Sequence, residues 1–144
     1  MLRRLTRSLD RIRQRAAHRT LSEEAAAGMK GEDIAQRYLE DRGYAILARN
    51  YRPRRGRGEV DLVVSKDGAL VFVEVKTRRS GEFGDPVRAI DGDKRRSLVS
   101  AAATFARRHH APAAAVRFDI VSVVLDEPLH VRHIENAFPF PVRW

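Results

Sequence analysis

The sequence predicts an α/β domain built around a central β-hairpin that other elements cover on both faces. Two runs rich in valine, leucine and phenylalanine flank Asp67-Gly68, a dipeptide that tolerates the positive φ angles of a tight hairpin turn. Helical patterns precede and follow this hairpin. The length of 144 residues suits one domain with a single core.

Composition limits the kinds of protein that this chain can be. It contains no cysteine, which excludes disulfides and thiolate zinc sites and is compatible with a reducing compartment, for which we expect the cytoplasm. No apolar run approaches a membrane span, and the arginines of the amino terminus do not fit a secretory signal. The formal net charge of +9 favours a nucleic-acid partner.

Most of this positive charge lies in a predicted amino-terminal extension, residues 1–28. Residues 1–20 hold seven arginines and one aspartate, so the other 124 residues carry only +3 of the net charge. Leucine, isoleucine and alanine recur there at helical spacing. The extension is either a basic amphipathic helix, lying on phosphates, on an anionic membrane or on the domain, or a frayed end. Residues 29–144 form the predicted domain.

The first element of the domain is a predicted helix over about Leu21 to Arg42. The helix either continues through Gly28 and Gly31 or breaks near them, and Gly43 suits the left-handed cap at its end. Glu32 falls at the edge of the apolar arc. It is either a third carboxylate aimed at the hairpin or an ordinary glutamate near a helix amino terminus, where the helix dipole favours it.

A strand is predicted over Tyr44 to Tyr51, and a basic loop over residues 52–58 leads from it into the hairpin. The arginines of this loop either receive the phosphates of a nucleic acid or simply form a solvated loop.

The register of the hairpin follows from its turn. With Asp67 and Gly68 at the turn, the numbers of facing residues sum to 135, so Asp61 faces Glu74. Lys76 lies two residues beyond Glu74 and therefore points to the same face. Facing residues place their Cβ atoms roughly 4.5–5.5 Å apart. Two carboxylates at that distance repel each other unless a proton or a cation lies between them.

A divalent cation is the natural occupant of this carboxylate pair. Magnesium and manganese usually take one or two protein carboxylates and complete their shells with water and substrate phosphate. Lys76 could then hold or deprotonate an attacking water, or offset charge on a phosphate. The alternative is a solvated surface hairpin in which Glu59 pairs with Lys76. That alternative leaves the facing carboxylates unexplained and exposes Val63 and Phe72.

A second helix is predicted over about Asp93 to Arg108, burying Leu98, Ala102 and Phe105 or their neighbours. Three successive cations, residues 94–96, crowd its first turn. Cations there oppose the helix dipole, whereas a polyanion bound near this end would explain them. The basic residues that we assign to nucleic-acid contact are Arg54, Arg55, Arg57, Arg78, Arg79, Lys94 and Arg95.

A strand over Ala115 to Leu125 and an edge strand over Leu129 to Ile134 complete the predicted elements. Asp119, on the first of these strands, either supports the site or forms a structural ion pair with Arg117 or a loop arginine. The ion pair is the favoured interpretation.

Several ordered motifs resemble the YraN-like family of uncharacterised bacterial proteins. The resemblance extends from about Gly31 to Phe138 and leaves the first 28 residues outside it. The motifs are Gly-Glu-x-x-Ala around Glu32, Asn50-Tyr51-Arg52, Gly58-Glu59-Val60-Asp61-Leu62, the run from Phe72 to Arg78, and Arg117-Phe118-Asp119.

That family resembles the restriction-endonuclease-like superfamily. The PD-(D/E)xK signature of the superfamily corresponds here to Asp61 and to Glu74-x-Lys76, with Val60 where the signature has proline. Glu32 stands in the place of the helix-borne acidic residue of archaeal-type Holliday junction resolvases. The resemblance implies a mixed central β-sheet flanked by helices, and a metal-dependent endonuclease that acts on DNA, branched or structured DNA included.

The resemblance also implies roles for individual residues. Asp61 and Glu74 would bind Mg²⁺ or Mn²⁺ with help from the Val75 carbonyl. Lys76 would position or activate water, and Glu32 would complete the outer shell or a second metal site. Junction-cutting nucleases often pair their subunits, so a homodimer is implied as well. The alternative function is a non-catalytic nucleic-acid-binding or scaffolding protein that retains the nuclease fold.

Overall fold

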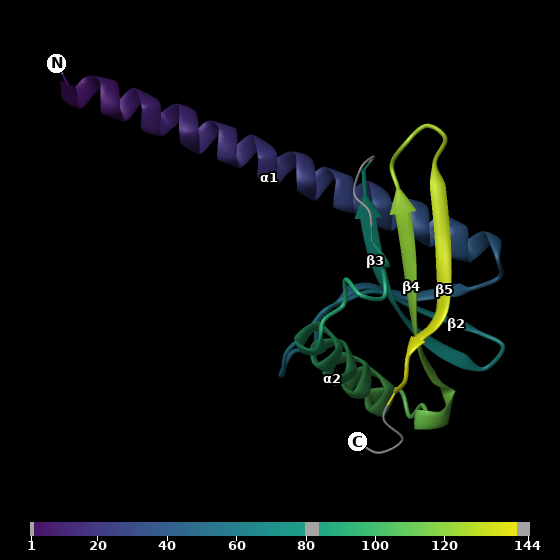
Figure 1. Ribbon diagram of the computed structural model, residues 1–144. Helices are drawn as coiled ribbons and strands as arrows, with labels where there is room; N and C mark the ends of the chain where they lie inside the picture. Colours follow the sequence, from purple (N-terminus) through teal and green to yellow (C-terminus); the bar gives the residue numbers. More distant parts are fainter. Residues whose placement is uncertain (1, 80–83, 141–144) are drawn as a thin grey trace. The chain divides into compact units, whose positions relative to one another are not determined.

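The computed structural model describes residues 2–79 and 84–140, and side chains of the first helix from Ser22 onward (Figure 1). The chain divides into two compact units, Met1–Lys30 and Gly31–Trp144. In the part of the chain that is described, no helix is both long and apolar enough to cross a membrane. The elements in chain order are α1 (Leu2–Asp41), β1 (Ala45–Tyr51), β2 (Val60–Lys66), β3 (Ala69–Arg78), α2 (Gly92–Arg108), the short 3₁₀ helix η1 (Ala113–Ala115), β4 (Val116–Val124) and β5 (His130–Phe138).

The described strands form one five-stranded sheet in the order β1-β2-β3-β4-β5. Strands β1, β2 and β3 are antiparallel neighbours, β3 and β4 are parallel, and β5 returns antiparallel to β4. A parallel pair needs a long crossover connection, which here contains α2. The predicted α/β class with a mixed central sheet flanked by helices is therefore confirmed, and this architecture is compatible with the restriction-endonuclease-like fold.

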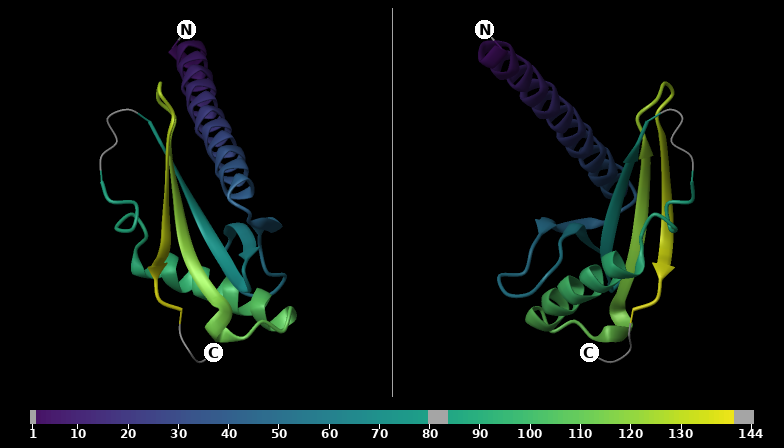
Figure 2. Two further views of the ribbon diagram at one scale, coloured as in Figure 1. Left: turned by 90° about the vertical axis from the view of Figure 1, so that its right-hand side faces the viewer. Right: turned by 60° about the vertical axis from the view of Figure 1, so that its left-hand side comes forward.

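Helix α2 packs across one face of the sheet (Figure 2). Its buried face includes the three residues predicted to be buried, and an aspartate cap begins the helix: the Asp91 side chain accepts a hydrogen bond from the Lys94 N–H at 2.8 Å. The buried residues that α2 and the sheet share in this core are Val60, Val63, Leu70, Phe72, Leu98, Ala101, Ala102, Phe105, Ala106, Phe118 and Ile120.

A second core lies on the opposite face of the sheet, against the carboxyl-terminal turns of α1. Ala35 and Leu39 supply its helical side, and Ile34 and Tyr38 pack at its margin. The strand residues buried in it are Leu62, Val64, Val71, Val73, Val121 and Val123. The hairpin formed by β2 and β3 is thus covered on both faces, as its apolar patterns predicted.

The hairpin has the predicted register. Leu62 pairs with Val73 and Val63 pairs with Phe72, so the numbers of the paired residues sum to 135. Val63 is 0% exposed and Phe72 is 1% exposed, which excludes the solvated surface hairpin. By strict alternation Val60 would share the face of Leu62 and Val64, but it packs in the core of α2 instead. At Val60, before Leu62, β2 pairs with β1 and does not yet pair with β3.

Of the two alternatives for the first helix, the structure shows the continuous one. Helix α1 runs continuously through Gly28 and Gly31 and ends at Asp41, and the φ of Gly43 is +86°, as a left-handed cap requires. Position 31 requires glycine, because there is no room for a side chain: a Cβ atom would lie 1.9 Å from the Thr77 Oγ1. Since α1 begins at Leu2, Glu32 is not in a first turn, and the helix dipole does not explain it.

Replacing Gly31 with alanine is expected to destabilise the domain by up to about 2 kcal/mol. Alanine gains about 1 kcal/mol of helix propensity, but forcing its methyl group against Thr77 costs about 1–3 kcal/mol. Gly28 is the matched control, because a Cβ atom there meets nothing within 4 Å, so Gly28→Ala should be neutral or stabilising. Chemical denaturation measures both. The explanation fails if Thr77→Ala does not relieve the cost of Gly31→Ala in the double variant.

Candidate active site

Asp61 and Glu74 lie where the hairpin ladder ends. The last pair between β2 and β3 is Leu62 with Val73. One residue further along, the Asp61 Oδ2 accepts a hydrogen bond from the Val75 N–H at 2.8 Å, so a side chain takes the place of the next strand-to-strand bond. The carboxylate of Asp61 is thereby fixed beside β3.

Glu74 is buried, with 6% of its surface exposed, and two ammonium groups reach one of its oxygens. Its Oε1 lies 3.6 Å from the Lys76 Nζ and 3.4 Å from the Lys94 Nζ. Its Oε2 is also buried, and it has no hydrogen-bond partner among the described residues. A buried carboxylate oxygen without a partner is costly. A hydrogen bond between the carboxyl groups of Glu74 and Asp61 also raises the pKa of Asp61, and it requires a proton, so this oxygen lacks a partner when both groups are charged.

The two carboxylates repel each other. Burial raises the pKa of Asp61 to about 7, and the charge of Glu74 adds to this increase, while the Val75 N–H and the Lys94 ammonium oppose it. The sequence predicted this repulsion from the register alone. The structure places Asp61, Glu74 and Lys76 together on one face, at the open end of the hairpin.

The residues present fit a hard divalent cation. The site offers two adjacent carboxylates and one unpartnered buried oxygen, and magnesium commonly uses one or two protein carboxylates. The N–H and C=O of a strand residue point to the same side, so the Val75 carbonyl faces the side of Asp61. Within residues 2–79 and 84–140, no three histidine, cysteine, aspartate or glutamate side chains form a metal-binding group. Any cation would thus need water and substrate to complete its shell.

Glu32 approaches the site from α1 but is engaged by an arginine. Its Oε2 lies 3.4 Å from the Arg49 Nη2. Burial raises the pKa of Glu32, and the charge of Asp61 raises it further, while hydrogen bonds from Asn50 and Arg49 lower it. Glu32 is therefore an electrostatic neighbour of Asp61 at the edge of the carboxylate pair.

The arginines of the loop between β1 and β2 are exposed, as a nucleic-acid contact requires. These residues are Arg54, Arg55 and Arg57. The loop ends at Gly58, where a Cβ atom would lie 2.3 Å from the Ser97 carbonyl oxygen of α2 and where φ is +104°. Glycine therefore lets the loop approach α2 closely. A hollow of about 700 Å³ lies beside this contact, lined by Gly56, Arg57, Asp93, Arg96, Ser97 and Ser100.

The other basic residues assigned to nucleic-acid contact lie in different surroundings. Arg79 is exposed, and Arg78 donates a hydrogen bond to the Gly84 carbonyl. The guanidinium of Arg95 lies 5.3 Å from the centre of the Phe138 ring, and its buried Nε has no hydrogen-bond partner among the described residues. Arg95 thus packs towards the end of β5.

The sequence placed Lys94 among surface contacts, but the structure places its ammonium beside Glu74. The signal was present, since a cation in a first helical turn is locally unfavourable. The sequence did not show on which face of the sheet the first turn of α2 lies.

Asp119 is a structural residue on the opposite face of the sheet. The register pairs Val73 with Asp119 and Glu74 with Ile120, so Asp119 points away from Glu74. Its carboxylate accepts hydrogen bonds from the Arg117 Nε at 2.8 Å, in the predicted ion pair, and from the Asn136 N–H at 3.0 Å, and it lies 2.7 Å from the His133 Nε2. Burial favours the neutral acid, but these partners outweigh it and lower the pKa of Asp119.

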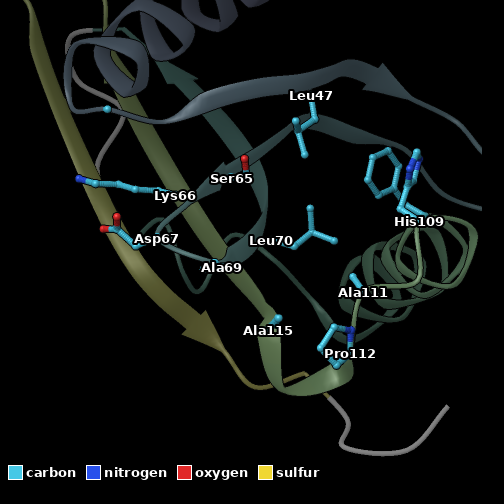
Figure 3. A pocket seen from close by; sticks show the side chains of 13 residues that line it. Leu47, Ser65, Lys66, Asp67, Ala69, Leu70, His109, Ala111, Pro112 and Ala115 are labelled. Atoms are coloured by element: carbon cyan, nitrogen blue, oxygen red, sulfur yellow. The ribbon is translucent and has the colours of Figure 1, made fainter.

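A separate cavity of about 690 Å³ lies at the turn of the hairpin, at the other end of the hairpin from the carboxylates. Figure 3 shows Leu47 and Leu70 on the strand side of this cavity and His109 on the side of α2. Asp61, Glu74 and Lys76 are not among its lining residues. This cavity is distinct from the candidate active site.

Comparison with known proteins gives a consistent family. The family described as "Uncharacterised protein family UPF0102" matches residues 31–123, beginning at the first residue of the second unit. A UPF0102 protein of Solibacter usitatus (strain Ellin6076) is 46% identical over 134 residues, covering 93% of this chain and 97% of that protein. A UPF0102 protein of Chloroherpeton thalassium (strain ATCC 35110 / GB-78) is 41% identical over 116 residues, covering 81% and 84%. A third, of Geobacter metallireducens (strain ATCC 53774 / DSM 7210 / GS-15), is 42% identical over 112 residues, covering 77% and 90%.

Proposed function

Because the chain belongs to the uncharacterised protein family UPF0102, whose description names no activity, we propose its function from its own site: metal-dependent hydrolysis of phosphodiester bonds in DNA. The observation that carries this proposal is the buried Glu74 beside Asp61, with no hydrogen-bond partner at one oxygen and two ammonium groups at the other. If Glu74 only formed a structural ion pair with a lysine, a second carboxylate that repels it would be unnecessary. A site that binds a divalent cation, in contrast, uses both carboxylates as ligands.

Asp61 and Glu74 would hold Mg²⁺ or Mn²⁺ in this proposal, and the Val75 carbonyl would help. The bound cation would supply charge neutralisation at the scissile phosphate and a more acidic water. Glu32, already close to Asp61, would support the outer shell. These assignments rest on the chemistry of the donors, which are hard oxygen ligands.

Lys76 would orient the attacking water. Its ammonium is held 3.6 Å from Glu74, so its position is fixed by the same carboxylate that holds the cation. In the reaction the water oxygen bonds to phosphorus as the bond to one ester oxygen breaks. The water loses a proton and the departing oxygen gains one, so one water and one phosphodiester give a phosphomonoester and an alcohol.

DNA is the proposed substrate, with branched or otherwise structured DNA included. The exposed arginines Arg54, Arg55 and Arg57, and the hollow that Arg57 shares with Arg96, offer phosphate contacts beside α2. Cutting both strands of a junction needs two sites, so we extend the proposal to a homodimer, which sedimentation of the free protein and of its DNA complex would detect.

The decisive test is a cleavage panel. Purified protein is incubated with labelled junction, flap and linear DNA in Mg²⁺, in Mn²⁺ and in EDTA. Cleavage should require the divalent cation and should be lost in Asp61→Ala and Lys76→Ala. Equal cleavage by wild type and both variants would trace the activity to a contaminant and would overturn the proposal.

Divalent cations are expected to stabilise the wild-type protein against heat, by about 1–2 kcal/mol once Mg²⁺ exceeds its Kd roughly tenfold. Asp61→Asn should remove this effect, because the amide lacks the negative charge that binds the cation. The substitution keeps an oxygen that can accept the hydrogen bond from the Val75 N–H, so the fold should be preserved.

Asp61→Asn should also be more stable than the wild type in EDTA at pH 8. The pKa of Asp61 is higher in the folded than in the unfolded protein, so the charged carboxylate costs stability increasingly as pH rises from 3.8 through about 7. Differential scanning fluorimetry with and without Mg²⁺ measures both effects. The same Mg²⁺ shift in both proteins would show that Asp61 does not hold the cation.

A non-catalytic nucleic-acid-binding or scaffolding protein is the second candidate, favoured by the exposed arginines of the β1–β2 loop. Such a protein needs those arginines but not the unpartnered oxygen of Glu74. Calorimetric titration separates the two candidates, since a pure binding module should give no heat with Mg²⁺ and should be unaffected by Glu74→Ala.

A further inference from the structure

We propose that Lys94 is a catalytic residue that stabilises the transition state by binding a non-bridging oxygen of the scissile phosphate. The inference rests on the proposed phosphodiester hydrolysis. It assigns to the first turn of α2 a role in the chemical step, where the sequence indicated only a contact with the nucleic-acid backbone.

The fold holds Lys94 at the site through its backbone. The side chain of Asp91 caps α2 by accepting the Lys94 N–H at 2.8 Å. From this fixed position the Lys94 ammonium lies 3.4 Å from the Glu74 Oε1. Its positive charge also lowers the pKa of Asp61, so it is electrostatically close to both carboxylates. Its side chain is 39% exposed, which leaves the ammonium open to a ligand from solution.

Helix stability does not explain this placement. A cation in the first turn of a helix opposes the helix dipole. Arg96, two residues later in the same turn, is paired with Asp93, an exposed carboxylate that belongs to the helix itself. Lys94 instead extends to a buried carboxylate that already has Lys76 as a partner. Without a bound cation, the two ammonium groups balance the charges of the two carboxylates, Glu74 and Asp61.

Counting charges shows what the second ammonium can do. With a divalent cation bound, the cation cancels the charges of Asp61 and Glu74. The two lysines then leave two positive charges in excess. A phosphodiester carries one negative charge, and it carries two once a deprotonated water adds to phosphorus. One lysine thus matches the ground state, while both together match the transition state. Charge that is balanced only in the transition state accelerates the chemical step.

The same geometry predicts a measurable effect without substrate. The Lys94 ammonium lies beside an oxygen of a proposed cation ligand, so it repels an incoming divalent cation. Removing it should make Mg²⁺ bind more tightly. A lysine that contacts only distant backbone phosphates would leave Mg²⁺ affinity unchanged.

Lys94→Met tests the proposal, since methionine keeps much of the apolar stem and removes the charge. We expect Mg²⁺ to bind about threefold to tenfold more tightly in calorimetric titration of the DNA-free protein. We also expect kcat for the preferred DNA substrate to fall about 100-fold, with KM changed by less than about threefold. Lys94→Arg keeps a cation at the site and should recover part of the kcat.

Arg96→Met is the matched control, because it removes a cation from the same helical turn that is paired with Asp93 instead of Glu74. It should raise KM and reduce the salt dependence of DNA binding, as expected of a phosphate contact, and it should leave the Mg²⁺ affinity of the DNA-free protein unchanged.

Three outcomes would overturn the proposal. If the wild-type protein cleaves DNA and Lys94→Met retains its kcat, Lys94 takes no part in the chemical step, and the proposed function stands without it. If Mg²⁺ affinity is the same in Lys94→Met and the wild type, the ammonium does not act at the cation site. A wild-type protein that neither binds Mg²⁺ nor cleaves DNA overturns the proposed function, and the role of Lys94 with it.

Discussion

Replacing Glu74 with glutamine is expected to lower the rate of DNA cleavage at least about 100-fold. Loss of an outer-shell partner of a metal ligand already costs about 10–100-fold, and Glu74 is proposed as a ligand itself. The amide keeps the shape of the side chain but removes the charge that a cation and two ammonium groups share. The deficit should appear in kcat and should not be recovered by raising Mg²⁺ to a moderate excess.

Glu59→Gln is the control for this substitution. Glu59 precedes β2, is partly exposed and pairs with Arg52 at 2.9 Å, so the same loss of charge occurs near the hairpin but away from the carboxylate pair. Its cleavage rate should stay within about twofold of the wild type, since exposed ion pairs contribute little. Circular dichroism establishes that both variants are folded. A Glu74→Gln protein that cleaves at the wild-type rate would remove the central observation from the proposed function.

The largest loss of stability is expected for Asp119→Ala, about 3–5 kcal/mol. Asp119 is 1% exposed, and its removal leaves Arg117, His133 and the Asn136 N–H without their shared acceptor. Buried donors without partners carry the full cost of their lost hydration. Denaturant unfolding at pH 7 measures the free energy directly. Asp93→Asn, which removes only the exposed pair with Arg96, should cost less than about 1 kcal/mol.

The contribution of Asp119 should depend on pH in a defined direction. Its pKa is lower in the folded protein than the ordinary value of 3.8. The stabilisation is therefore complete above about pH 4 and is lost as pH falls through the lower, folded pKa. The difference in unfolding free energy between the wild type and Asp119→Asn should shrink in that acid range. A difference that stays constant down to pH 2.5 would mean that the charge of Asp119 contributes nothing.

The sequence predicted the hairpin and the carboxylate pair correctly because both depend on local rules. A two-residue turn fixes the register, and alternation fixes the face, so Asp61 and Glu74 could be brought together from residue numbers alone. The two buried faces followed from the same alternation. The face of Val60 could not be predicted in this way, because alternation holds only where β2 and β3 are paired, and the sequence does not show where that pairing ends.

Features that depend on tertiary contacts could not be predicted in this way. Gly31 has the local signature of a helix break, and its true role, a close approach to Thr77, needs the position of β3. Lys94 looked like a surface cation because nothing local shows where a crossover helix begins in space. Strand β5 extends to Phe138, beyond its predicted end at Ile134, because Phe138 pairs with Phe118. The register shifts between Ile134 and this pair, and there the Asn136 N–H donates to the side chain of the buried Asp119.

The parallel step between β3 and β4 has a consequence for folding kinetics. The carboxylate pair lies within one hairpin and can form early, since its loop is short. The ammonium of Lys94 arrives only with the crossover that joins Glu74 to Ile120 of β4, a contact between distant parts of the sequence. Until that crossover closes, the nascent hairpin carries two repelling carboxylates with only half of their compensating positive charge. In a refolding experiment, the complete site should therefore appear with the slowest structural phase and not with the first.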